Sequence, residues 1–234
     1  MGANDACNTS HVTVTILERE MYTEAAAAPL LRVAPSTLHW WLEGRHPRYR
    51  PVIRVEPTGS RIVTWAEFVE AALLRSYRRD HDVPLRELRD FIDGMREEFQ
   101  VPYPLADRRP YIGPGRRLLI DLQGRSHLDP DFCLVAIANG QEVLTAPGEE
   151  FFERVDWSGD EPSAWRPHDD PASPVRINPL VRFGRPSVGG ISTEAIAGEL
   201  DGGASVEEVA EDFALDLDAV RWAHSYELAQ NAAA

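Results

Sequence analysis

The stretch MYTEAAAAPLLRVAPSTLHWWLEGR (21–45) decides the N-terminal fold, because it contains two helix-forming segments on either side of a short turn. Thr23 precedes an alanine-rich run, where its hydroxyl can accept a hydrogen bond from a free backbone N–H of the first helical turn. Pro35 stands at an early position of the second segment, where its missing N–H costs little. The stretch therefore predicts two short helices joined by a turn.

The helical spacing of the apolar residues assigns one face of these helices to the core. The residues expected to pack there are Ala25, Leu31, Leu38 and Trp41. The residues expected on the outward face of the second helix are Ser36, Thr37, His39 and Trp40. Hydroxyl side chains suit phosphates or base edges when a helix lies in the major groove of DNA. Of the two adjacent tryptophans, one is expected in the core and the other at the surface or an interface.

Further signals follow up to residue 100. The segment RYRPVIRVEPTGSRIVTW (48–65) holds two β-prone runs separated by Pro-Thr-Gly, which predicts a hairpin. Thr64 and Glu67 have the spacing of a capping box and predict the start of a third helix. The segment VPLRELRDFIDGMREEF (83–99) carries its apolar residues on one helical face, so a fourth, amphipathic helix is expected.

Charge is distributed unevenly along the chain. The formal net charge is −14, and all 24 basic residues are arginine. Residues 19–100 hold 13 arginines and 13 acidic residues, whereas residues 194–234 hold one arginine and ten acidic residues. DNA repels carboxylates, so any DNA contact is expected in the N-terminal part. The arginines expected to clamp phosphates there follow the second helix and are Arg45, Arg48 and Arg50.

The middle of the chain, residues 101–174, is the least informative. Three runs, at 117–122, 133–146 and 151–157, are expected to form short strands, and Asn139-Gly140 is a strong hairpin turn. WRPHDDPASP (165–174) is expected to be a proline-rich acidic linker. These strands could extend the N-terminal domain, dimerise across a two-fold axis or bind a partner protein.

The C-terminal part, residues 175–234, is expected to form three helices. Gly202-Gly203 ends the first of them, and Ser205 and Glu208 form a second capping box. The overall expectation is therefore an α+β chain with an N-terminal domain (11–100), a small antiparallel β region with a linker (101–174) and a C-terminal three-helix domain (175–234).

The first hundred residues resemble the MerR-like winged helix-turn-helix. The residues that carry the resemblance are Tyr22, Ala25, Ala26, Leu31, Val33, Ser36, Thr37, Leu38 and Trp41, followed by the expected hairpin wing and two helices. This resemblance implies DNA binding through the second helix and the wing. From the residues alone, the same pattern could also be a helical scaffold with a solvated arginine face.

The C-terminal part resembles a small antitoxin family whose members pair with PIN-type ribonuclease toxins. The matching segments are FGRPSVGG (183–190) and GASVEEVAEDF (203–213), followed by a final helix. The family's Thr-Arg-Ile after the glycine is replaced here by Ile191-Ser192-Thr193, so any role of that Thr-Arg pair is not carried over. Together, the two resemblances imply a VapB-class type II antitoxin that binds and silences a PIN-domain ribonuclease, forms a homodimer and represses its own operon.

Two groups of residues are candidates for toxin binding. One group consists of arginines that can pair with toxin carboxylates, namely Arg176, Arg182 and Arg185. The other consists of acidic residues that can steer the chain toward the basic surface of an RNA-binding partner, namely Glu207, Glu208, Glu211 and Asp212. The competing interpretations are that Arg185 hydrogen-bonds within its own domain and that the acidic residues form a solvated face that aids solubility.

No pattern in the sequence indicates catalysis, a metal site or a cofactor. His168-Asp169-Asp170 lies in the expected linker and lacks partner ligands at helical spacing. Cys7 and Cys133 lie in unrelated contexts, which favours a reducing cytoplasm, and neither a signal peptide nor a membrane span is indicated. Two alternatives to an antitoxin stay open: a MerR-like regulator that senses a ligand through residues 116–157, and a scaffold protein that does not bind DNA.

Overall fold

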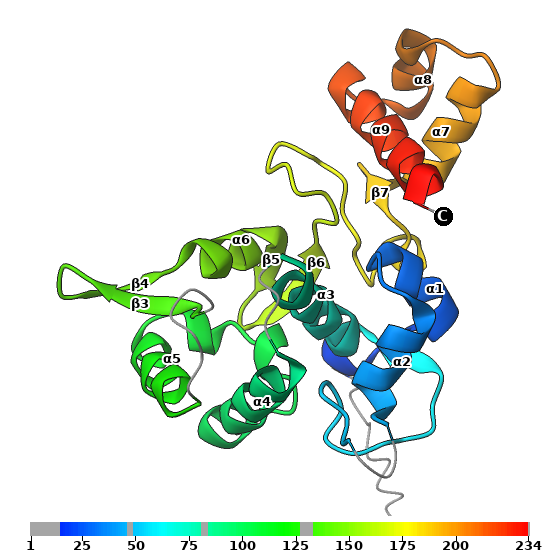
Figure 1. Ribbon diagram of the computed structural model, residues 1–234. Coiled ribbons are helices and arrows are strands. Elements are labelled where there is room, and N and C mark those ends of the chain that lie inside the picture. Colours follow the sequence, from blue (N-terminus) through cyan, green and yellow to red (C-terminus); the bar gives the residue numbers. More distant parts are fainter. Residues whose placement is uncertain (1–14, 46–48, 81–83, 127–132, 234) are drawn as a thin grey trace, which may run out of the picture.

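The computed structural model describes residues 15–45, 49–80, 84–126 and 133–233. Helices and short antiparallel strand pairs are mixed along the chain (Figure 1), which confirms the expected α+β class. The first half of the chain consists of 3₁₀ turn η1 (Ile16–Glu18), β1 (Glu20–Thr23), α1 (Glu24–Leu30), α2 (Pro35–Glu43), β2 (Ile62–Thr64), α3 (Trp65–Asp80), α4 (Leu85–Phe99), η2 (Pro104–Ala106) and η3 (Arg109–Tyr111). Its second half consists of α5 (Pro114–Arg125), β3 (Val135–Ala138), β4 (Gln141–Leu144), α6 (Ala146–Arg154), β5 (Val155–Ser158), β6 (Glu161–Trp165), η5 (Arg182–Gly184), β7 (Ser187–Val188), β8 (Ile191–Ser192), α7 (Thr193–Asp201), α8 (Val206–Phe213) and α9 (Leu217–Ala233).

The N-terminal helices begin where the sequence predicts. The Thr23 hydroxyl accepts a hydrogen bond from the Ala26 N–H at 3.2 Å, which caps α1. Pro35 is the first residue of α2. At the start of α3, the Thr64 N–H donates to the Glu67 carboxylate at 2.9 Å and the Glu67 N–H donates to the Thr64 hydroxyl at 3.3 Å. The capping box predicted for this helix is therefore confirmed.

The hairpin predicted for residues 48–65 is wrong, because its second run pairs elsewhere. β2 is hydrogen-bonded to β1 in antiparallel register, with Thr23 opposite Ile62. The first run is buried as irregular chain: the N–H groups of Val52 and Ile53 both donate to the Trp41 carbonyl, at 2.9 and 3.0 Å. The β-prone residues of this run thus satisfy the end of α2 instead of a neighbouring strand.

The middle region is more helical than the sequence predicts. Residues 117–122, expected to form a strand, lie in α5, and residues 151–154 complete α6 before β5 begins at Val155. The hairpin at Asn139-Gly140 is confirmed by the β3–β4 pair. The buried Gln123 side chain of α5 fixes this hairpin, since it accepts from the Leu134 N–H at 2.7 Å and donates to the Val135 carbonyl at 2.8 Å.

The three predicted C-terminal helices are confirmed as α7, α8 and α9, here called the C-terminal bundle. The first ends at Gly202, and the second begins with the predicted capping box of Ser205 and Glu208. Val209, Val220 and Tyr226 are among the buried residues of its core. Figure 1 shows the bundle standing beyond β7, apart from the elements that surround α3.

Buried apolar residues of the described chain form two clusters. The larger one takes residues from α1 through β6 to Ile177, so α5, α6 and the β5–β6 pair share a core with α1–α4. The smaller one runs from Val175 to Tyr226. The division at residues 100 and 174 stays a prediction. None of the helices in the described part of the chain has the length and apolar character needed to cross a lipid bilayer.

Candidate nucleic-acid interface

The outward face of α2 is the first component of the site. Leu38 and Trp41 are buried, whereas Trp40 is 40% exposed, so the predicted division between the two tryptophans is confirmed. Ser36 is exposed, and Thr37 and His39 are half-buried. Since α2 turns its apolar residues inward at helical spacing, its remaining polar residues and one indole ring are available to a partner.

A sharp turn after α2 brings an arginine back over this face. Gly44 ends the helix at φ +74°, and a Cβ atom there would lie 2.4 Å from the Tyr49 carbonyl oxygen, so only glycine fits. Arg45 and Tyr49 then exchange two backbone hydrogen bonds, of 2.8 and 3.1 Å. The reversal places the Arg45 guanidinium 4.2 Å from the centre of the Trp40 ring, a cation–π contact.

A cleft of about 260 Å³ opens beside Trp40 and extends to the first turn of α4. Its lining residues, which define the Trp40 cleft, are Trp40, Gly44, Arg45, Tyr49, Arg50, Leu85, Arg86 and Arg89. Four of these described residues are arginines, two are aromatic and none is acidic. Guanidinium groups bind phosphates and aromatic rings stack on bases, so the cleft offers the two contacts that a nucleic acid needs.

Two of the four guanidinium groups are only loosely engaged within the protein. The Arg50 side chain is 72% exposed and lies 3.5 Å from Asp93. The Arg86 side chain is 89% exposed and lies 4.0 Å from Asp90. Ion pairs this exposed contribute little to stability, so a phosphate can replace the carboxylate at small cost. Arg89, by contrast, donates to the Pro51 carbonyl at 3.3 Å and fixes the floor of the cleft.

A second hollow lies on the other side of α2, and its chemistry is different. The nearly buried Glu24 carboxylate is 3.0 Å from the His39 Nδ1 and 2.7 Å from the Arg61 guanidinium. Ser36 and Trp40 also line this hollow of about 420 Å³. Because a carboxylate lies behind Ser36 and His39, phosphate binding is favoured on the Trp40–Arg45 side of α2.

A buried ion cluster beneath the site holds the loop after α2 in place. The Arg54 guanidinium pairs with Glu43 at the end of α2 and with Glu67 at the start of α3, the latter at 2.7 Å. It also donates to the carbonyls of Ser60 and Ile62, at 3.0 and 2.8 Å. Partial burial opposes ionisation of Glu43, but N–H groups of the loop and the Arg54 charge together hold the pKa of that carboxyl below its ordinary value.

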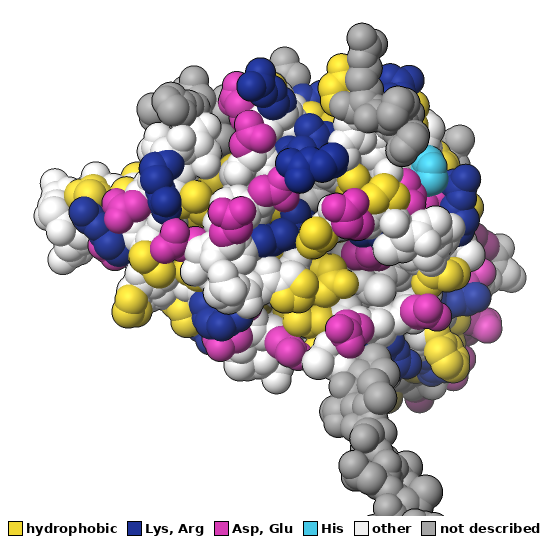
Figure 2. All heavy atoms as spheres, turned by 90° about the horizontal axis from the view of Figure 1, so that it is seen from below, with side chains coloured by type: hydrophobic (Ala, Val, Ile, Leu, Met, Phe, Trp, Pro, Cys, Tyr) yellow, Lys and Arg dark blue, Asp and Glu magenta, His cyan; other side chains and the backbone are white. Residues whose placement is uncertain are grey.

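The surrounding surface is mixed in charge. Figure 2 shows arginine side chains beside carboxylates and apolar groups on the face seen from below in Figure 1, not one continuous basic patch. This agrees with the equal numbers of arginines and acidic residues between 19 and 100. Attraction to a polyanion therefore depends on local groups such as the Trp40 cleft, and not on the overall field.

The structure brings together part of the predicted DNA-binding set. Trp40, Arg45 and Arg50 meet in the Trp40 cleft, whereas Ser36 and His39 line the neighbouring hollow. Arg48 lies outside the described residues. The cleft residues that were not predicted from the sequence are Tyr49, Leu85, Arg86 and Arg89. The only available signal was that Arg86 and Arg89 are three positions apart, on one side of the predicted fourth helix.

The predicted toxin-binding arginines make contacts within the chain. Arg176 donates to Asp156 at 2.9 Å and to the carbonyls of residues 173 and 175. Arg182 donates to the Gly190 carbonyl at 2.7 Å. Arg185 pairs with Glu194 at 2.9 Å, which is the intradomain contact that the competing interpretation expected.

The predicted acidic residues lie on α8, at the end of the bundle far from α1 (Figure 1). All four, Glu207, Glu208, Glu211 and Asp212, are exposed. Glu208 is engaged in the capping box, and the N–H and hydroxyl of Ser205 hold its pKa below the ordinary value. The arginines and these acidic residues are therefore two separate surfaces. In the described residues, no group of His, Cys, Asp and Glu side chains is arranged to hold a metal ion.

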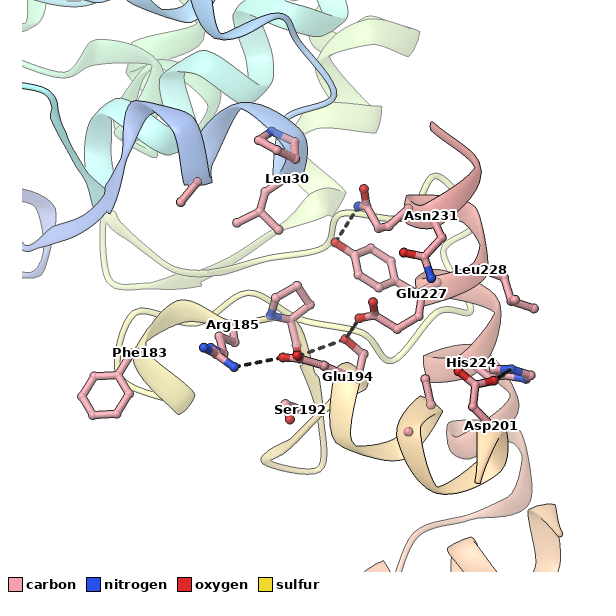
Figure 3. A pocket seen from close by; sticks show the side chains of 18 of the residues that line it. Leu30, Phe183, Arg185, Ser192, Glu194, Asp201, His224, Glu227, Leu228 and Asn231 are labelled. Carbon is pink, nitrogen blue, oxygen red and sulfur yellow. Dashed lines mark hydrogen bonds and ion pairs between the residues drawn. The ribbon is translucent and has the colours of Figure 1, made fainter. Parts of the chain in front are cut away.

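A larger hollow of about 710 Å³ lies between α1 and the C-terminal bundle. Figure 3 shows its labelled residues, which come from α1 (Leu30), from η5 and the residue after it (Phe183, Arg185), from β8 (Ser192), and from α7 and α9. Glu227 accepts from the Thr193 hydroxyl, and Asp201 lies 3.7 Å from His224. Polar groups on its walls are thus largely paired with each other.

The fold and the site define a mixed α+β protein in which an exposed helix borders an arginine-lined cleft. No family model matches the chain. The chain is 31% identical to the uncharacterized protein Rv2308 of Mycobacterium tuberculosis, in an alignment that covers 94% of this chain and 97% of that protein. The chain belongs to the same family as Rv2308.

Two further comparisons concern the same organism. The chain is 26% identical to "Putative antitoxin VapB45", over 86% of this chain and 91% of that protein. The crystal structure of Rv2018 superposes with a TM-score of 0.70 and 26% identity, over 87% of this chain and 97% of that chain. The chain thus has an antitoxin-like relative along most of its length.

Proposed function

We propose that the chain is the antitoxin of a type II module: it binds and inhibits a PIN-domain ribonuclease and represses its own operon as a homodimer in the cytoplasm. In this role it acts as a stoichiometric binder and not as an enzyme. The observation that carries the antitoxin role is the similarity to a protein named as an antitoxin, which extends over 86% of this chain. A match of that extent includes the N-terminal part as well as the C-terminal bundle.

Operator binding is supported by the Trp40 cleft. Its four arginines border an exposed helix, and two of them are held only by exposed ion pairs. Phosphate contacts fix the register of a protein on DNA, and the adjacent face of α2 would then meet base edges. A MerR-like arrangement, in which α2 enters the major groove, fits this placement.

DNA binding can be tested with two arginines in matched settings. Arg86 in the Trp40 cleft and Arg117 on α5 are both exposed and both face an aspartate one helical turn later. Arg86→Ala should weaken binding to promoter DNA and lower the slope of log affinity against log salt by about 0.9, since each phosphate contact releases counterions. Arg117→Ala should leave both unchanged. The measurement is fluorescence anisotropy over a salt series, and equal effects of the two substitutions would exclude the cleft as the binding site.

Toxin pairing is tested by co-expression with the product of the adjacent reading frame. The tagged chain should retain that protein, and ribonuclease activity should appear only after the chain is removed by denaturation and the partner is refolded. The acidic residues of α8 that stay free of the capping box, among them Glu207 and Glu211, would then steer association. If nothing co-purifies while promoter DNA is still bound, a regulator without a toxin becomes the better account.

A further inference from the structure

Two large apolar side chains project from one short loop at the base of the C-terminal bundle. The segment NPLVRFGR (178–185), here called the anchor loop, exposes 67% of Leu180 and 86% of Phe183. Within the described part of the chain, these are the two most exposed large apolar residues. Figure 3 shows the Phe183 ring pointing away from the ribbon and from the other labelled side chains. Apolar groups that gather on one part of a surface mark an interaction site more often than a single exposed side chain does.

The backbone of the anchor loop is strained where Phe183 projects. Arg182 and Phe183 have φ values of 48° and 55°, and Gly184 follows at 77°. Residues with a Cβ atom seldom adopt this left-handed region, and two in succession are rarer still. Strain of this kind persists only where the surroundings enforce it, and it concentrates at binding sites.

Several contacts enforce this conformation. The Tyr22 hydroxyl, from β1, donates to the Gly184 carbonyl, and burial raises the pKa of Tyr22 so that the hydroxyl stays a donor. Gly184 has a positive φ of 77°, and a Cβ atom there would lie 2.6 Å from the Tyr22 hydroxyl, so another residue would strain the backbone and displace this hydroxyl. Arg182 donates to the Gly190 carbonyl at 2.7 Å, which ties the loop to the β7–β8 turn. The Phe183 ring is therefore presented by a loop fixed on both sides, which lowers the entropy lost on binding.

Charge around the anchor loop indicates the kind of surface that it fits. Residues 171–193 contain three arginines and no acidic residue, although the chain carries a net charge of −14. Arg185 pairs with Glu194 just outside this segment, but both side chains are largely exposed, at 66% and 75%, so a carboxylate of a partner can replace Glu194 at small cost. An apolar pocket rimmed by carboxylates would complement both the ring and its flanking arginines.

A nucleic acid fits this surface poorly. The aliphatic Leu180 cannot stack on a base as an aromatic ring does. Residues 194–234, which form the adjoining bundle, contribute ten acidic residues and one arginine and would repel phosphates. A second copy of the chain also fits poorly, because a two-fold contact centred on the loop would bring each Arg182 and Arg185 against the same residues of the other copy.

We infer that Phe183 and Leu180 form a preorganised anchor that inserts into an apolar, acid-rimmed pocket of the ribonuclease partner. This inference rests on the proposed function, and it makes the anchor loop the energetic centre of that interface. Aromatic side chains with neighbouring arginines are the residues that most often dominate binding energy, and here they occupy one rigid loop.

The test uses the full chain and the product of the adjacent reading frame as the probe. Phe183→Asn removes the ring but keeps a residue that tolerates the left-handed backbone. It should weaken binding at least about 30-fold, mainly by faster dissociation. Leu180→Ser should weaken it by a smaller factor in the same direction. The control is Ile137→Asn on β3, an apolar residue that is 54% exposed and far from the loop in sequence. Biolayer interferometry gives the rates, and thermal unfolding verifies that each variant is folded.

The outcomes are distinguishable. If the wild-type chain binds the probe and Phe183→Asn binds it equally well, the anchor is overturned while the antitoxin role stands. If the wild-type chain does not bind the probe, both the pairing and the anchor fail. If Phe183→Asn instead converts a dimer to a monomer in light scattering, the loop is an interface between copies and the inference is overturned.

Discussion

Glu70 on α3 is a fully buried carboxyl whose neighbours stabilise its charge incompletely. Burial raises its pKa to about 8, although the Arg96 guanidinium at 3.9 Å and the Leu105 N–H at 3.0 Å favour the ionised form. Its Oε2 atom has no hydrogen-bond partner. Between pH 4.5, the ordinary glutamate pKa, and pH 8, Glu70 is therefore mostly protonated in the folded protein and mostly ionised in the unfolded chain.

The stability of the protein should fall as pH rises across this interval. Below pH 4.5 both states are protonated and the contribution of Glu70 is fully present; it is lost as pH rises through the folded pKa of about 8. Glu70→Gln, which is neutral and can still accept from Leu105, should flatten the curve and be the more stable form at high pH by on the order of a few kcal/mol. Urea unfolding between pH 5 and 8.5 measures this. Exposed Glu97→Gln is the control, and parallel curves for wild type and Glu70→Gln would contradict the assignment.

At the scale of elements, the turn that ends α2 sets the geometry of the Trp40 cleft. Gly44 and Gly59 both have positive φ, of 74° and 70°, but only Gly44 has neighbours within 4 Å of an added Cβ. Gly44→Ala should therefore cost about 2–4 kcal/mol from strain and collision, and Gly59→Ala about 1 kcal/mol from strain alone. Denaturant titrations compare the two stabilities.

The same pair of substitutions separates stability from binding. Gly44→Ala should also weaken promoter binding under conditions where the variant is fully folded, because Arg45 can no longer return over Trp40. Gly59→Ala should bind DNA like the wild type. Equal binding by both variants would show that this turn does not shape the binding surface.

Elements with local signals could be predicted from the sequence. The starts of α1, α3 and α8 were predictable because their capping side chains bond to backbone groups at most three residues away. These side chains are Thr23 for α1, Thr64 and Glu67 for α3, and Ser205 and Glu208 for α8. The β3–β4 hairpin was predictable for the same reason, since Asn139-Gly140 suits a tight turn on its own.

Elements that depend on partners far along the chain could not be predicted from the sequence. β2 pairs with β1, which precedes α1 and α2 in the chain, and no feature of residues 48–65 predicts this pairing. The run 117–122 is short enough to fit either a strand or a helix. In the structure it is helical, and Leu119 and Leu122 are buried on one face of α5. The Trp40 cleft was only half predictable, because Arg86 and Arg89 reach it from a helix far along the chain.

At the scale of the whole molecule, few groups join the C-terminal bundle to the larger core. The Tyr22 hydroxyl bonds to Gly184, and the His168 ring meets the edge of Trp222 at 4.9 Å between ring centres. Backbone hydrogen bonds also join Trp165 to Ile177 and Arg176 to Ser187, so the chain at residues 175–177 links the two hydrophobic clusters. Loss of one such contact should therefore loosen the junction without unfolding either core.

Tyr22→Phe tests this expectation. The substitution leaves the Gly184 carbonyl without its donor and should cost about 1 kcal/mol. Hydrogen exchange should accelerate over residues 180–186, while protection in α3 stays as in the wild type. Tyr49→Phe, which removes an exposed hydroxyl, is the control. Uniform acceleration across the molecule would indicate that the junction and the larger core unfold as one unit.

The buried Arg54 cluster would limit how far the protein can adapt its shape to a DNA duplex. One guanidinium joins the end of α2, the loop at 58–62 and the start of α3. These parts must then move as one body, so the protein has little freedom to follow the contour of its ligand. Under the proposed operator binding, the adjustment would fall on the DNA, whose bending energy depends on base sequence. We therefore expect a preference for easily kinked pyrimidine–purine steps at positions that no side chain touches.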